Sequence, residues 1–482
     1  MDRRDFMRAG LQGATAVAAA QLAQVPTPAL AQPAPTVPSS QRPNVLYFIC
    51  HDLGTALSCY NWPNVKSPNL DAFAAEGVRF TNYYCGSTPC SPSRGCIVTG
   101  RYAHSNGLIG LANKGWSLPE TERTVVDYFN DAGYYTANLG GQHERVGPNP
   151  YAYKETKLGP RTADRIADEV CDFLKRFDRT KGPFYLNAYT QEVHAPWDRP
   201  EFQGRYNPAE VTPLPFQGDI PFVRNSLAAF YGSVSFMDEQ FGRILACLHE
   251  TGLDQNTWVI FTTDHGVGFP RAKSTLYDPG LLTALLMRWP GRLKPGTTCD
   301  HLLSNLDLLP SQLEALGIPA SAAIQGRSFA PAVLGGEYTP RDAIFAERNY
   351  HDDYDPMRCV RTRQYKYIRN YGLRAGPKLP EEETAEDTGI TLWNSGRPRP
   401  REELYDLTRD PNEFNNLAED PGSATVLTQM RERLDTWMRD TNDYMRGARE
   451  FVDYPSEDRR TLPLPLGASP KPQPRRPPQP RP

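Results

Sequence analysis

Four runs of apolar residues, each of strand length, organise the chain up to about residue 340. They are NVLYFIC (Asn44–Cys50), YYTANLG (134–140), PFYLNAYTQ (183–191) and WVIFTTD (258–264). A continuous apolar run is typical of a strand that is covered on both faces, as in a parallel sheet. Helical patterns such as RIADEVCDFLKRF lie between the runs. The alternation predicts an α/β fold with a large, mostly parallel sheet between two layers of helices.

The pattern changes after residue 340, where short strands follow one another closely. The segments IFAERNY, CVRT and YKYIRN have the composition of strands, and a helical pattern covers about residues 424–446. We therefore expect a larger domain over residues 43–340 and a smaller α+β domain, with a short antiparallel sheet, over residues 341–456.

The two ends of the chain differ in composition from the rest. Residues 1–31 carry Arg3 and Arg4 ahead of an Ala-rich run that ends in Ala-Leu-Ala, and they resemble a twin-arginine signal peptide. Residues 32–42 form a Pro-rich linker, and residues 457–482 a Pro-rich tail that we expect to be disordered. No later segment approaches the roughly 18 uninterrupted apolar residues of a membrane helix. We expect a bacterial protein that the twin-arginine translocase exports to the periplasm or beyond, without a membrane span after processing.

Net charge and cysteine usage exclude two classes of function. The net charge of -3 excludes a generally basic nucleic-acid binder, so an anionic ligand must be held by local positive charge. None of the 9 cysteines lies in a C-x-x-C pair, which argues against a zinc ribbon. Their odd number leaves at least one thiol outside any intramolecular disulfide.

Polar residues that can do chemistry follow each of the four apolar runs. The chain continues into His51-Asp52, Gln142-His143, Glu192-Val193-His194 and Asp264-His265-Gly266. Ligands of open α/β sheets bind beyond the carboxyl ends of the strands, so these groups can meet in one crevice. Asp52 and Asp264 offer hard oxygen ligands to a divalent cation, and His51 and His265 can add imidazole nitrogen. The alternative for either Asp alone is a turn-forming residue, and His104, His249 and His301 are taken as loop or core residues.

The stretch TPCSPSRGCIVTGR (88–101) places a cysteine at the start of a helix. The helical pattern runs from about Ser91 to Thr99 and is closed by Gly100. Free N–H groups and the helix dipole favour an anion at this end, and Arg94 is one turn along, where it can offer a bidentate fork to an oxyanion. The pattern indicates a metal-assisted, nucleophilic site for a sulfate-like or phosphate-like group. We assign no catalytic role to Cys96.

The run from Cys90 to Arg94 has the form C-x-P-x-R and is followed by Thr-Gly-Arg. It resembles the signature of type I sulfatases of the alkaline phosphatase superfamily. Segments 67–84, 264–280 and 403–420 resemble other blocks of that family, so the resemblance covers about residues 43–450. It implies an alkaline phosphatase-like sheet, a catalytic domain over residues 43–340, and hydrolysis of a sulfate ester or sulfamate. It also implies that a separate formylglycine-generating enzyme oxidises the signature cysteine.

The resemblance implies a role for each matching residue. Cys90 is the precursor of formylglycine (3-oxoalanine); one hydroxyl of the hydrated aldehyde attacks sulfur, and the other later collapses to eject sulfate. Arg94 stabilises the hydrate and Lys273 binds a sulfate oxygen. His143 is the base that expels sulfate, and His194 protonates the departing alcohol or amine. The metal, usually calcium, has Asp52, Asp264 and His265 as its implied ligands, and we expect His51 and Cys90 beside them in the metal site.

Two positions depart from the family pattern. His51 stands where the family has a second Asp, which lowers the negative charge and makes Mg²⁺, Mn²⁺ or Zn²⁺ conceivable beside Ca²⁺. Gly141 stands where the family has a sulfate-binding lysine. Gln142 can supply a neutral donor there, or Arg145 can reach in.

Two further patterns are similar to the heparan N-sulfatase branch of the family. One is the spacing from Asp264-His265 to Lys273, and the other is Asn-Tyr-His351-Asp followed by Pro-Met-Arg358. They imply a sulfated sugar or other sulfated small molecule as the substrate, with His351 and Arg358 as substrate contacts; the alternative for these two is interdomain packing.

Two other functions stay open at this point. A phosphonate monoester or phosphodiester hydrolase can use the same modified cysteine with Asp and His ligands. An inactive, sulfatase-like binding protein would keep Cys90 as a thiol.

Overall fold

The computed structural model describes residues 42–147, 151–351, 354–372 and 399–446. The export signal, almost all of the Pro-rich linker and the C-terminal tail lie outside the described residues. They remain predictions.

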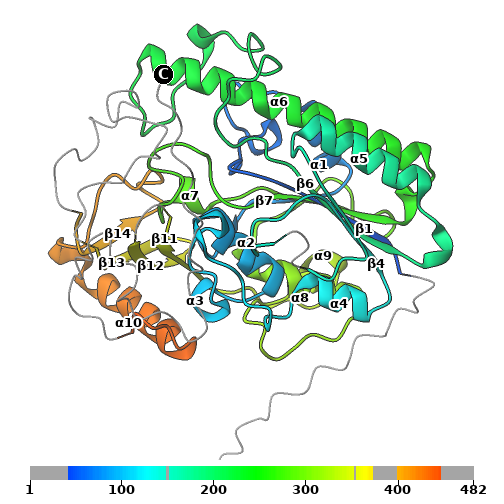
Figure 1. The fold of residues 1–482 in the computed structure, drawn as a ribbon. Coiled ribbons are helices and arrows are strands. Elements are labelled where there is room, and N and C mark those ends of the chain that lie inside the picture. Colours follow the sequence, from blue (N-terminus) through cyan, green and yellow to red (C-terminus); the bar gives the residue numbers. More distant parts are fainter. Residues whose placement is uncertain (1–41, 148–150, 352–353, 373–398, 447–482) are drawn as a thin grey trace, which may run out of the picture. The chain divides into compact units, whose positions relative to one another are not determined.

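An eight-stranded sheet forms the centre of the larger domain (Figure 1). From one edge its strands are β5 (Glu155–Leu158), β4 (Tyr135–Gly140), β6 (Phe184–Tyr189), β1 (Asn44–Cys50), β7 (Thr257–Thr263), β8 (Leu285–Arg288), β2 (Val78–Phe80) and β9 (Thr297–Cys299). Only β8 runs antiparallel to its neighbours in this sheet. The mostly parallel sheet is confirmed, and each of the four predicted strands is found within two residues of its expected bounds.

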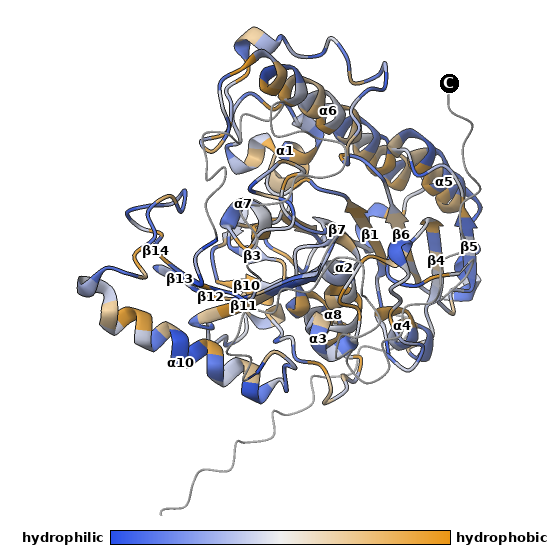
Figure 2. Ribbon diagram, turned by 60° about the vertical axis from the view of Figure 1, so that its left-hand side comes forward, coloured by the Kyte–Doolittle hydropathy of each residue, from blue (hydrophilic) through white to orange (hydrophobic). Residues whose placement is uncertain are grey.

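Helices cover both faces of the sheet because β1 and its neighbours are apolar on both sides. Leu46 and Phe48 pack with α1 (Pro68–Ala75), α5 (Ala163–Arg176) and α6 (Pro221–Glu250). Val45 and Tyr47 point the other way, into a core that includes α4 (Val125–Asp131), α8 (Leu308–Ala315) and Ile97 of α2 (Cys90–Thr99). Figure 2 shows β1 largely in apolar colours and the outer helices α5, α6 and α10 with alternating apolar and polar bands.

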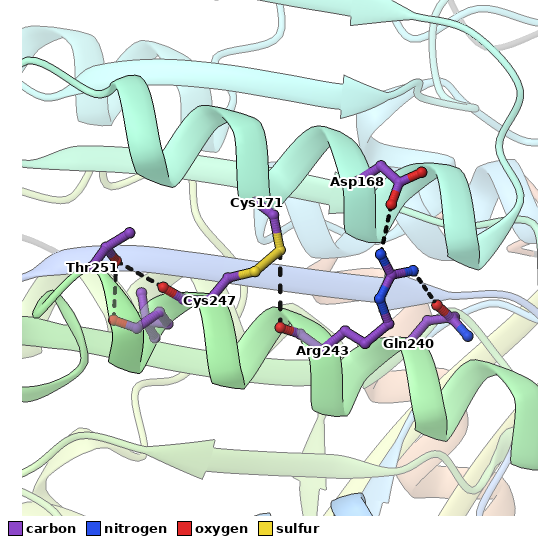
Figure 3. The surroundings of a disulfide bond; sticks show 7 residues. Asp168, Cys171, Gln240, Arg243, Cys247 and Thr251 are labelled. Atoms are coloured by element: carbon purple, nitrogen blue, oxygen red, sulfur yellow. Dashed lines mark hydrogen bonds and ion pairs between the residues drawn. A yellow bond between two sulfur atoms is a disulfide. The ribbon is translucent and has the colours of Figure 1, made fainter.

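A disulfide joins the two long helices on one face of the sheet (Figure 3). It links Cys171 of α5 to Cys247 of α6, across 76 residues of sequence. Beside it Arg243 of α6 contacts Asp168 of α5 at 2.7 Å. The other seven cysteines, all within the described residues, are free. Sequence reasoning had left this pairing open.

The second sheet is antiparallel and is built after residue 342. Its strands are β11 (Ala343–Tyr350), β12 (Tyr354–Thr362), β13 (Tyr365–Asn370) and β14 (Glu402–Asp406), in that order. Helix α10 (Ala424–Asp440) packs on β12 and β13, and it ends six residues before the predicted helix does. The smaller α+β unit is thereby confirmed in its architecture.

Short elements complete the described part of the chain. They are β3 (Tyr83–Tyr84), β10 (Leu303–Ser304), α3 (Ala103–Asn106), α7 (Asp278–Leu281) and α9 (Ala330–Leu334). None of the helices in the described ranges has both the length and the apolar character that a membrane span requires.

Candidate active site

The polar residues that follow four strands come together at one edge of the large sheet. Strands β4, β6, β1 and β7 are neighbours and parallel, so their carboxyl ends share that edge. The imidazole ring of His51 lies 5.8 Å from the ring of His143 and 5.7 Å from that of His194, centre to centre. The structure therefore brings all four predicted strand-end groups into one site.

A cluster of possible metal ligands forms the floor of this site. One donor atom from each of His51, Asp52, Cys90 and Asp264 lies within 4.8 Å of the others, and all four residues are buried. Nε2 of His265 adds a fifth donor, 3.2 Å from Oδ1 of Asp52. The five residues are those that the sequence pattern named as ligands.

Two imidazoles each point a ring nitrogen at this cluster. Nδ1 of His51 lies 2.9 Å from Oδ2 of Asp264, and its Nε2 contacts the hydroxyl of Tyr189. Nδ1 of His265 donates to the carbonyl oxygen of Gly266 at 3.0 Å, which leaves Nε2 facing Asp52 and Cys90. Burial and the charge of Arg94 lower the pKa of His51 to about 3, so this imidazole is neutral. Two imidazole nitrogens beside two carboxylates fit a divalent cation.

Asp52 is held in an unusual backbone conformation. Its φ of 52° lies in the left-handed region, which Asp tolerates better than most residues, and its N–H donates to Oδ1 of Asp264 at 3.0 Å. Burial alone raises the pKa of Asp52, but Nζ of Lys273, 2.8 Å from Oδ2, lowers it well below the usual range. The carboxylate is ionised and ready to act as a ligand.

Residue 90 opens helix α2, as the sequence predicts, and Gly100 closes the helix with a φ of 65°. Sγ of Cys90 lies 3.2 Å from Nε2 of His265. Burial raises the pKa of the Cys90 thiol, so the thiol stays protonated. An uncharged thiol is a weak nucleophile.

Arg94 is buried beneath the ligand cluster. Nε donates to Oδ2 of Asp264 at 3.1 Å, and Nη2 donates to the carbonyl oxygen of Cys50 at 3.0 Å. These bonds tie helix α2 to the ends of β1 and β7. The third guanidinium nitrogen, Nη1, makes no hydrogen bond to any described residue. It can therefore donate to a group attached to residue 90.

Lys273 and His194 form the more open side of the site. Nζ of Lys273 lies 3.0 Å from Nε2 of His194, whose Nδ1 donates to the carbonyl oxygen of Ala195 at 2.5 Å. His194 keeps 25% of its side chain exposed, whereas Asp52 keeps 1%. Across the site, burial lowers the pKa of His143 well below the usual range, so this imidazole is neutral and can accept a proton.

The remaining predicted substrate contacts are Gln142, His351 and Arg358. The Gln142 amide folds back on its own loop, donating to the carbonyl of Arg145 at 2.5 Å and accepting from the N–H of Glu144 at 2.8 Å. Arg358 is fully buried on β12, where Nη2 donates to Oδ1 of Asp443 at 2.9 Å. His351 directly follows β11 and is half-buried. The ion pairs of Arg358 are with residues of the smaller domain itself, and the roles of Gln142, His351 and Arg358 stay predictions.

Sequence reasoning missed two residues beside the site. Tyr189, the last residue of β6, contacts Nε2 of His51 with its hydroxyl, and burial raises its pKa to about 12. Arg161, in the loop before α5, places its guanidinium carbon 5.3 Å from the centre of the Tyr189 ring. The position of Tyr189 at the end of a predicted strand could have indicated that it lies at the site. No feature of the sequence around Arg161 indicated the same.

Two family models match the chain. The model described as Sulfatase matches residues 43–318, and the model described as N-sulphoglucosamine sulphohydrolase, C-terminal, matches residues 268–377. The chain is also similar to human N-sulphoglucosamine sulphohydrolase, with 29% identity over 458 residues, covering 83% of this chain and 90% of that protein.

Solved structures share the fold. One, determined in complex with its substrate D-glucosamine-2-N,6-O-disulfate, has a TM-score of 0.68 at 19% identity and covers 85% of this chain and 100% of its own. The phosphonate monoester hydrolase of Agrobacterium radiobacter has a TM-score of 0.66 at 20% identity and covers 83% and 96%. At these identities the likeness concerns the fold, which two different chemistries share.

Proposed function

Because the chain belongs to the sulfatase family and is a sulfuric ester hydrolase, we propose that it removes a sulfate group from a sulfated sugar, as a sulfate ester or a sulfamate. The sugar is supported by the human relative and by the disulfated glucosamine in the structural neighbour. The observation that carries the mechanism is the position of residue 90, at a helix N-terminus and in contact with the ligand cluster.

We propose that Cys90 is converted to formylglycine by a separate formylglycine-generating enzyme. A hydrated aldehyde supplies a hydroxyl to attack sulfur and a second hydroxyl from which the C–O bond to sulfate can be broken. The protonated state of the buried thiol supports this conversion, because the unmodified residue is poorly nucleophilic. Arg94, one turn along the same helix, is the residue that we propose holds the hydrate.

A divalent cation bound by His51, Asp52, Asp264, His265 and residue 90 would supply positive charge to the sulfate oxygens. The two imidazoles leave calcium, magnesium, manganese and zinc as candidates.

The chain's own residues divide the proton transfers between two sides of the site. Lys273 binds a sulfate oxygen and is fixed by Asp52 and His194. His194, whose side chain is 25% exposed, protonates the leaving oxygen or nitrogen of the sugar. His143 is neutral and takes the proton from residue 90 when sulfate is released.

We also propose that the protein is exported, by the twin-arginine translocase, to the periplasm or beyond. The Cys171–Cys247 disulfide supports this, because disulfides persist mainly in oxidising compartments.

Two measurements test the function. Steady-state rates on an aryl sulfate, an N-sulfated glucosamine and a phosphodiester rank the substrates, and negligible turnover of both sulfated compounds would overturn the proposal in favour of phosphoryl chemistry. Peptide mass spectrometry across residues 88–94, after expression beside a formylglycine-generating enzyme, should show the aldehyde. A thiol alone would indicate an inactive binding protein.

A further inference from the structure

We propose that Arg161 binds the anionic group of the substrate at the place where the chain has glycine at residue 141. This assignment rests on the proposed sulfatase function. It names a residue that is distant in sequence from all the motifs of the site and that reaches the site from the loop between β5 and α5.

The first observation is that Arg161 occupies the space of a side chain at residue 141. A Cβ added to Gly141 would lie 3.0 Å from Nε of Arg161, 3.2 Å from its Cζ and 3.3 Å from one terminal nitrogen. The φ of Gly141 is 146°, a conformation that L-residues rarely adopt. Backbone conformation and space together keep this position glycine, and the positive charge beside it comes from Arg161.

The second observation is that the loop is fixed to the strand end beside the site. The carbonyl oxygen of Arg161 accepts hydrogen bonds from N–H of Gln191 at 2.7 Å and from the hydroxyl of Thr190 at 3.1 Å. Both donors directly follow β6, whose chain continues to His194. Arg161 is thus held at the same edge of the sheet as the proposed proton donor.

The third observation concerns charge. The Arg161 guanidinium makes no hydrogen bond and no ion pair with any residue of the described ranges, and it is half-buried against the Tyr189 ring. Arg94 lies over the same ring at 4.5 Å but is paired with Asp264. A half-buried guanidinium with no carboxylate partner is well suited to bind an oxyanion through two parallel N–H groups.

The two nearby alternatives are already engaged. The side-chain amide of Gln142 is hydrogen-bonded to the backbone of its own loop. Arg145 donates to the carbonyl oxygens of Pro119 and Glu122, each at 2.9 Å, and stacks on Tyr151. Neither side chain can reach toward residue 141 without giving up these bonds, whereas Arg161 is already there.

The test compares Arg161→Met, Arg161→Lys and the control Arg165→Met, which removes the same charge from an exposed position four residues along. For each we would measure kcat/KM on the best sulfated substrate and the rise in Tm caused by inorganic sulfate. We expect Arg161→Met to lower kcat/KM by about tenfold or more, the typical effect of losing one charge-assisted hydrogen bond, and to weaken sulfate binding by a similar factor. Arg161→Lys should retain part of both effects, and Arg165→Met should match the wild type.

Unchanged sulfate binding in Arg161→Met overturns the proposal, whether or not turnover falls, because a loss of turnover alone would indicate a positioning role. The Tm without sulfate reports whether each variant folds, and Arg161→Lys remains informative if the Met variant is unstable. A wild type that binds sulfate through Arg161 but turns over no sulfated compound would leave the assignment of Arg161 intact and overturn the proposed function instead.

Discussion

Nδ1 of His51 lies 2.9 Å from Oδ2 of Asp264, within the cluster of possible metal ligands. The other ring nitrogen is engaged by Tyr189, and the imidazole is neutral. A ring nitrogen and a carboxylate oxygen this close together are placed to act as neighbouring ligands of one cation. In the proposed metal site an imidazole nitrogen thus takes the place of the carboxylate that the family resemblance implies, and the identity of the metal should follow.

We expect His51→Asp to shift the metal preference toward calcium. The change replaces a neutral nitrogen with a charged oxygen, and oxygen ligands favour Ca²⁺ over first-row transition metals. Metal-free protein would be equilibrated with equal Ca²⁺ and Mn²⁺, and the bound metals measured by elemental analysis. The Ca²⁺:Mn²⁺ ratio should rise about tenfold or more over the wild type. His249→Asp, at an 80% exposed side chain, is the control, and equal ratios in all three proteins would show that His51 is not a ligand.

Cys90→Ala should abolish turnover and leave the fold intact. Removing the proposed nucleophile should lower kcat by at least about 10³-fold, since only binding and the surrounding charges remain. Circular dichroism and Tm would report folding. Cys96→Ala, at a buried cysteine in the same helix, is the matched control and should keep the wild-type kcat. Turnover that survives in the Cys90 variant would rule out this nucleophile.

Removing the Cys171–Cys247 disulfide should destabilise the protein without changing the chemistry. A cross-link that closes a loop of 76 residues stabilises by about 4 kcal/mol in the chain-entropy model. Urea unfolding of the double variant Cys171→Ala/Cys247→Ala would measure the loss, and kcat should stay unchanged. A reductant should destabilise the wild type but not the double variant; equal sensitivity would mean that this bond is not what stabilises the wild type.

We expect Arg358 to be a structural residue and His351 to be a substrate-binding residue. Arg358→Met leaves Asp443 and Glu347 buried without their cation, which typically costs about 3–5 kcal/mol of unfolding free energy. His351→Ala should leave the Tm nearly unchanged and raise KM. The measurements are Tm and KM on the same sulfated sugar. A raised KM with an unchanged Tm in Arg358→Met would restore Arg358 as a substrate contact.

The sequence predicted the sheet and the ligand cluster well, for a physical reason. Buried strands such as Asn44–Cys50 leave an unmistakable apolar run, and the parallel direction of the strands brings His51, Asp264 and their neighbours to one edge. The end of helix α2 could also be predicted from the sequence, because Gly100 adopts the left-handed conformation that ends many helices.

What the sequence could not predict depends on how distant segments meet. The approach of Arg161 to Gly141 is set by the packing of the loop before α5 against the end of β6, and no local pattern encodes it. The partner of Cys171 is chosen by the packing of α5 on α6. Arg358 sits in a segment that looks like a surface motif, and only the tertiary structure shows Asp443 beside it.

The burial of Cys90 constrains the order of events in the cell. Its side chain is 2% exposed, and residues 91–94 beside it are buried as well. An enzyme that must bind this segment and reach its sulfur cannot do so once α2 has packed beneath the sheet edge. The proposed conversion of the cysteine would therefore come during or just after synthesis, before the chain folds over it. On this proposal, a cell without the modifying enzyme at that moment would make a well-folded protein that could not be activated later.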